Sequence, residues 1–294
     1  MPLIRPFAGL RPVPQYAAEV LAPPYDVLSS AEARVRAEGH PWSFLHISKA
    51  EIDLPEDINP HDPAVYRKAA ENLDRMIRES ILVRDQQPCY YVYRLTRGEH
   101  VQTGLVAVAS VTDYISNRIR RHEFTRPDKE DDRVRQIDAL NAQTGPVLMA
   151  YKSQPEMNNM LEEVTHDRPE VGVMADDGIE HTIWVVRDAA VADRISEGFD
   201  AMESLYIADG HHRSAAAARV ARDRHAATAA VSAGEAMSGY FLTVIFPHDQ
   251  MLILDYNRVI RDLNGMSAET FLARITEDFS VQAAAQAVHP PVSY

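Results

Sequence analysis

Five consecutive residues that could bind or transform a charged ligand follow one short apolar run: Asp209, Gly210, His211, His212 and Arg213. The run before them reads as a buried strand, and the alanine-rich segment after them reads as a helix. The first turn of a helix presents free N–H groups and the positive end of the helix dipole, so it favours an anion. Arginine adds a planar guanidinium suited to phosphate or carboxylate. This strand-turn-helix motif at 205–217 predicts a phosphate site formed by Gly210, His211, His212 and Arg213.

A solvated helix start is the alternative interpretation of the same residues. Cations at a helix N-terminus are electrostatically unfavourable unless an anion offsets them, so three potential cations here favour a ligand. Asp209 could cap the helix with its side-chain oxygen, bind Mg²⁺ or orient an acceptor hydroxyl. Gly210 permits a backbone geometry or a close approach that a Cβ would block.

A second dense run of charge occupies residues 118–133. Its acids follow Thr125–Pro127 and suit the first turns of a helix that begins there. A solvated helix with local ion pairs is the common fate of such a run. The functional interpretation assigns Arg121 and Arg126 to the neutralisation of phosphate charge and Glu123 to acid–base catalysis.

A third candidate, Asp26, lies in a proline-rich segment that covers the first thirty residues. Prolines 23 and 24 predict a rigid, extended loop in which Asp26 could simply form a turn. Loops also carry many functional groups, so Asp26 is a second candidate for taking the proton of a hydroxyl substrate.

The elements that must position these residues mix strands and helices irregularly. Helices are expected at 29–38, 63–80, from 127 onward, and at 155–164, 190–202, 211–225 and 268–279. Strands are expected at 42–47, 89–95, 101–111, 147–151, 171–175, 181–186, 205–208, 240–246 and 251–255. The many hairpins predict an α+β fold with mixed and antiparallel sheets and packed helices, rather than a doubly wound sheet.

Composition excludes several classes of protein. The net charge of −13 over 294 residues argues against broad binding of nucleic acid or anionic membranes. Cys89 is the single cysteine, so an internal disulfide is impossible. No stretch approaches the length of a membrane span, and the N-terminus lacks the apolar region of a signal peptide. These features predict a reduced, cytoplasmic protein.

Five segments together resemble one family: residues 22–27, 121–133, 142–147, 206–216 and 255–258. The chain resembles the bacterial and archaeal domain of unknown function 1015, which is related to the ParB/sulfiredoxin fold. The resemblance implies one compound α+β unit over 1–294 with a ParB/sulfiredoxin-like core. Family members continue further, so a C-terminal portion is expected to be missing. Phe124 departs from the pattern, where a lysine is expected.

The motif from Asp209 to Arg213 is also similar to that of ParB-related free-serine kinases. This similarity implies a nucleotide phosphate at the helix start and an aspartate that assists catalysis. Sulfiredoxin activity is not expected, because it needs a cysteine at the motif.

The leading hypothesis is a phosphotransferase that uses Mg²⁺, a nucleotide (ATP or ADP) and a small hydroxyl acceptor such as serine. Asp209, Asp26 and Glu123 would be catalytic, and Asp209 would also bind the metal. Two alternatives stay open. One is a nucleotide-gated binding protein without transfer, and the other is a metal-dependent hydrolase with four candidate ligands: His122, Glu123, Asp209 and His211.

Overall fold

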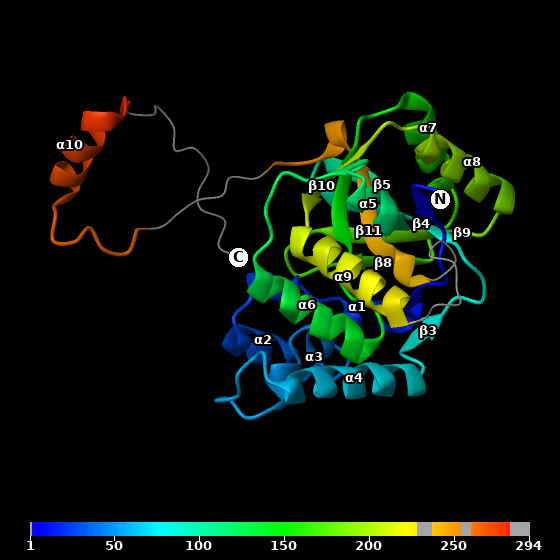
Figure 1. The fold of residues 1–294 in the computed structure, drawn as a ribbon, viewed down its shortest axis with the longest axis horizontal. Coiled ribbons are helices and arrows are strands. Elements are labelled where there is room, and N and C mark those ends of the chain that lie inside the picture. The colour runs from blue at the N-terminus through cyan, green and yellow to red at the C-terminus, as the bar shows by residue number, and fades with distance from the viewer. Residues whose placement is uncertain (1, 228–236, 254–259, 283–294) are drawn as a thin grey trace. The chain divides into compact units, whose positions relative to one another are not determined.

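The computed structural model describes residues 2–227, 237–253 and 260–282. The chain divides into two compact units, Met1–Met251 and Leu252–Tyr294, each of which is considered by itself. The first unit contains every candidate site residue and combines a mixed sheet with packed helices (Figure 1). The predicted α+β fold class is confirmed.

A mixed sheet forms the centre of the first unit. Among the described residues its strands follow the order β6-β10-β7-β11-β5-β4-β9-β8, and β1 also pairs with β5. The β6–β10 and β7–β11 pairs are parallel and the others are antiparallel. The strands are β1 (Ile4–Arg5), β4 (Tyr90–Arg97), β5 (His100–Ser110), β6 (Ile119–Arg120), β7 (Val147–Tyr151), β8 (Val171–Met174), β9 (Glu180–Val186), β10 (Leu205–Asp209) and β11 (Tyr240–Pro247). A separate antiparallel pair joins β2 (Leu10–Pro12) to β3 (Leu82–Arg84).

Two groups of helices pack on this sheet. The first is α7 (Pro155–Val164) and α8 (Ala189–Asp200), whose apolar residues share one core with Leu105, Ala107 and Phe241 of the sheet. In the second group α9 (His211–Ala227), α6 (Pro127–Leu140) and α4 (Pro63–Arg78) follow one another in successive rows (Figure 1). One apolar stripe of α4 is buried, because Val65, Ala69, Leu73 and Met76 lie in a second core.

Shorter helices complete the first unit. They are α1 (Ala17–Val20), α2 (Ser30–Ala37), α3 (Leu45–Ser48) and α5 (Val111–Ile115), with one-turn 3₁₀ helices at Pro14–Tyr16, Tyr25–Val27, Ala50–Asp53, Met237–Gly239 and His248–Gln250. A capping box starts α2: the Glu32 N–H donates to Ser29 Oγ at 3.2 Å, and the Ser29 N–H donates to Glu32 Oε2 at 2.8 Å. In the second unit, Ser267 caps α10 (Ala268–Asp278).

The predicted strand at 42–47 is wrong, because this segment contains the short helix α3. Leu45 and Ile47 are both buried, but they enter two different cores. A short apolar run that is buried on several sides carries no period that separates strand from helix.

The predicted strand at 251–255 is also wrong where the structure describes it. Residues 251–253 are not in a strand, and residues 254–255 lie outside the described residues. The preceding strand, β11, pairs with β5 on one edge and with β7 on the other, so it has no free edge for a hairpin partner.

Of the helices within the described ranges, none is long and apolar enough to cross a membrane.

We expect Gly104 on β5 to tolerate no side chain. A Cβ there would lie 2.6 Å from the carbonyl oxygen of Ile245 and 2.6 Å from the ring of Phe246. Gly104→Ala should lower the free energy of unfolding by about 1–3 kcal/mol, the usual cost of overpacking. Urea titration measures the change. Gly172→Ala on the edge strand β8 is the matched control, since no described atom lies within 4 Å of its Cβ position. Equal stabilities of the two variants would contradict this expectation.

Candidate functional site

The corner between β10 and α9 is built on a glycine turn. Gly210 has a φ of 98°, and a Cβ there would lie 3.1 Å from the Arg213 guanidinium and 3.3 Å from the Cα of Val147. The Ser214 N–H donates to the Gly210 carbonyl at 3.0 Å, so Gly210 occupies the N-cap position of α9. The prediction that Asp209 caps the helix is therefore wrong. Asp209 precedes the cap, at a register shift in the β10–β7 pairing.

Arg213 folds back over this turn. Its guanidinium donates to the Asp209 carboxylate and to the carbonyl oxygen of Pro146. The Asp209 side chain is 66% exposed, whereas the Arg213 side chain is 20% exposed. The corner thus presents an accessible carboxylate beside a guanidinium that is braced on two sides.

His211 is a buried residue that positions the neighbouring charged segment. The residue is only 3% exposed, and its Nδ1 lies 3.4 Å from Glu123 Oε2. Its Nε2 accepts a hydrogen bond from the His122 N–H at 3.5 Å, and the two imidazole rings meet edge-on at 4.5 Å. Burial lowers the pKa of His211 and so does His122, while Glu123 and Asp209 act in the opposite direction. A neutral ring with its proton on Nδ1 satisfies both contacts.

A hydrogen bond joins the starts of two long helices. The Arg126 N–H, at the N-cap of α6, donates to His212 Nε2 on the first turn of α9 at 3.1 Å. The Arg126 guanidinium extends outward and pairs with Asp128 at 2.8 Å. Two helix N-termini therefore lie next to each other, with their positive dipole ends at the same place.

The loop that carries Asp26 meets this region through Tyr25. The guanidinium of Arg133 lies over the Tyr25 ring, 4.1 Å from its centre. Burial raises the pKa of Tyr25, and the charges of Arg133 and Arg213 oppose that effect. The three segments singled out in the sequence, around residues 26, 121–133 and 209–213, therefore converge.

The remaining predicted site residues have ordinary surroundings. Arg121 is exposed and holds its guanidinium 4.7 Å from the centre of the Tyr114 ring on α5. Glu123 is 58% exposed and faces His211. Phe124, the departure from the family pattern, is 99% exposed. The structure brings Glu123, Arg126 and Asp209–Arg213 together directly, whereas Arg121 contacts a different element.

Sequence reasoning missed two residues that hold the site together, Arg133 and Asp132. Asp132 is buried in the second turn of α6, where it contacts Arg133 and accepts hydrogen bonds from Tyr66 at 2.6 Å and His61 at 2.9 Å. Burial alone would raise the pKa of Asp132, but these partners outweigh it and lower the pKa. Both residues belong to the charged run at 118–133, but its functional interpretation named Arg121, Glu123 and Arg126 alone.

Within the described ranges, no group of three or more histidines, cysteines or carboxylates is placed to hold a metal ion. The four hydrolase ligands expected from the sequence therefore do not form a metal-binding cluster. Asp209 offers one accessible carboxylate, a donor set that fits Mg²⁺ only when ligand phosphates and water supply the other positions.

We expect His211 to make the stability of the protein depend on pH. Since its folded-state pKa is lowered, His211 contributes stability that is complete above the unfolded value of about 6.5 and is lost as the pH falls through the folded value. Urea unfolding of the wild type should show a loss of stability between about pH 7.5 and about pH 5.5.

In His211→Asn that loss should be smaller, whereas the control His166→Asn, at an exposed histidine, should keep the wild-type loss. The neighbouring groups His122, His212, Glu123 and Asp209 are present in all three proteins, so the difference reports on His211. Identical pH profiles for His211→Asn and the wild type would contradict this assignment.

Comparison with known proteins supports one family. Neither the comparison with curated proteins nor that with solved structures gave a match. A family model described as "Protein of unknown function (DUF1015)" matches residues 4–293. Because the match spans nearly the whole sequence, the chain belongs to this family.

Proposed function

We propose that this protein is a nucleotide-dependent phosphotransferase that acts on a small hydroxyl metabolite, in the manner of the ParB-related free-serine kinases. The observation that carries the proposal is the junction of α6 and α9 at the Arg126–His212 hydrogen bond. Two helix N-termini meet there beside two arginines and two accessible carboxylates. Phosphoryl transfer needs mainly such positioned positive charge and a group that accepts the hydroxyl proton.

The phosphate groups of the nucleotide would lie at the start of α9. Free N–H groups of the first helical turn would donate to phosphate oxygens, together with Arg213, Arg126 and His212. Gly210 allows the phosphate to approach the backbone closely. Arg121 could add charge only after leaving the Tyr114 ring. His211 is assigned a positioning role, because its ring is buried and both nitrogens have partners.

Glu123 is the best placed general base. It is accessible, and its contact with neutral His211 fixes one of its carboxylate oxygens. The carboxylate would take the proton of the acceptor hydroxyl, the acceptor oxygen would form the bond to phosphorus, and the shortened nucleotide would leave with the electrons of the broken P–O bond. Asp26 is the second candidate for this base. When bound, Mg²⁺ would neutralise charge on the phosphate oxygens, and Asp209 would hold it.

Arg213→Ala should weaken nucleotide binding by about ten- to a hundredfold, because a charge-assisted contact to phosphate is lost. Isothermal titration with ATP and with ADP, each with and without Mg²⁺, measures this. Arg222→Ala is the matched control, since Arg222 lies on the same helix and, among the described residues, pairs with the adjacent Asp223 alone. Arg213 also braces Pro146, so Arg213→Lys, which keeps the charge, checks for a loss of local structure. Unchanged affinity in Arg213→Ala would reject the phosphate site.

Asp209→Asn should separate transfer from binding. The substitution keeps the size and polarity of the side chain but removes the carboxylate, so turnover should be lost while nucleotide affinity is largely kept. The measurement is product formation from ATP or ADP with serine and other small hydroxyl compounds. Wild-type binding without transfer to any acceptor would instead favour a nucleotide-gated binding protein.

A further inference from the structure

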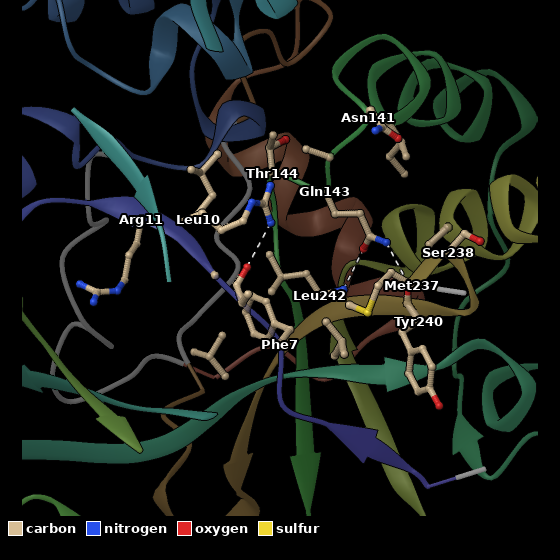
Figure 2. A pocket seen from close by; sticks show the side chains of 18 of the residues that line it. Phe7, Leu10, Arg11, Asn141, Gln143, Thr144, Met237, Ser238, Tyr240 and Leu242 are labelled. Atoms are coloured by element: carbon tan, nitrogen blue, oxygen red, sulfur yellow. Dashed lines mark hydrogen bonds between the residues drawn. The ribbon is translucent and has the colours of Figure 1, made fainter. Parts of the chain in front are cut away.

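A cavity of about 500 Å³ lies between the central sheet, the β2–β3 pair and the helices α4, α6 and α9 (Figure 2). Cavities of this size hold small organic molecules in many proteins. The cavity contains none of the candidate site residues described above. It is formed within the first unit of the chain.

The wall on the sheet side is apolar because of strand alternation. Successive side chains of β5 and β11 point to opposite faces. Leu105, Ala107 and Phe241 belong to the core that also contains the apolar residues of α7 and α8, whereas Val106, Val108 and Leu242 line the cavity. Figure 2 shows Leu242 facing the same space as Phe7 and Leu10. Val106 and Leu242 remain only half-buried, which leaves apolar surface for a ligand to cover.

The loop wall of the cavity is preformed. The Gln143 side chain accepts from the Leu242 N–H at 2.8 Å and donates to the Tyr240 carbonyl at 3.0 Å, which fixes the loop against β11. Both bonds are visible in Figure 2. A ligand therefore meets a wall that needs little ordering, which lowers the entropic cost of binding.

The charged residues that line the cavity are all positive. Three arginines and no aspartate or glutamate line the cavity, although acids outnumber bases by 43 to 30 in the chain. Arg11 is paired with Asp85 at 2.8 Å and Glu170 at 3.1 Å, and Arg224 is paired with Asp138 at 3.2 Å. Arg84 donates to the Ala8 carbonyl at 3.1 Å, and no carboxylate among the described residues lies within ion-pairing distance of it. Arg84 is therefore the cation that can receive an anionic ligand group.

We propose that this cavity binds a small amphipathic anion, whose apolar chain or ring lies on Val106, Val108 and Leu242 and whose anionic group meets Arg84. The size of the cavity, its apolar sheet wall and the single sign of its charges together select this class over neutral and cationic molecules. The inference stands independently of the phosphotransferase proposal.

The experiment uses anilinonaphthalenesulfonate, an amphipathic anion whose fluorescence rises in apolar surroundings, with the full chain. Displacement is then measured with decanoate and, separately, with decylammonium, which has the same chain length and the opposite charge. We expect one saturable site, from which decanoate displaces the probe at a concentration about tenfold lower than decylammonium does, as a contact to one charged group implies.

Two variants locate the site. Val106→Phe places a larger side chain on the apolar wall where the ligand would lie and should abolish saturable binding. Arg84→Gln should remove most of the preference for decanoate. Arg97→Gln, at an exposed arginine at the far end of β4, should behave as the wild type. Near-ultraviolet circular dichroism and the urea midpoint check folding, since partly folded chains also bind this probe. Equal displacement by both ligands, or undiminished binding to folded Val106→Phe, would overturn the proposal.

Discussion

The candidate site depends on the left-handed backbone at Gly210. Because any Cβ there would press on the Arg213 side chain and on the backbone of β7, only glycine allows α9 to begin immediately after β10. The same short turn directs Arg213 back to Asp209 and to the carbonyl of Pro146. A longer connection would separate the strand end from the helix dipole. The charge arrangement at the corner is therefore a consequence of one backbone conformation.

Two buried polar residues fix the surroundings of that turn, and their charge states differ for physical reasons. His211 has few compensating charges, so burial keeps it neutral and leaves it able both to donate and to accept. Asp132 is surrounded by Arg133, Tyr66 and His61, so it keeps its charge although it is buried. His211 holds the segment that contains Glu123 against α9. Asp132 connects α6 to α4, because it accepts the hydrogen bond from Tyr66. Buried polar groups that are satisfied in this way specify one arrangement of elements.

Local patterns predicted much of the fold. The strand at 147–151 and the helix at 155–164 occur with the bounds that their periodicity and flanking prolines indicated. The motif at 205–217 was correctly identified as strand, turn and helix. The contact that joins the two helix starts was not predictable, because Arg126 and His212 are 86 residues apart and neither side chain has a distinctive spacing. The same holds for Tyr25 beneath Arg133, and for a cavity whose walls come from ten separate segments of chain.

Electrostatics connects the site to the composition of the whole chain. A net charge of −13 repels anionic ligands at long range, so their capture must depend on cations gathered locally. At the corner, the arginine nearest the helix dipole is already neutralised by Asp209, which offsets the unfavourable position of a cation there. In the proposed phosphotransfer an arriving phosphate would take the place of that carboxylate on Arg213. The Asp209 carboxylate would then be free to bind a metal ion or to orient the acceptor hydroxyl. Phosphate binding would in this way make Asp209 available for the phosphoryl transfer that follows.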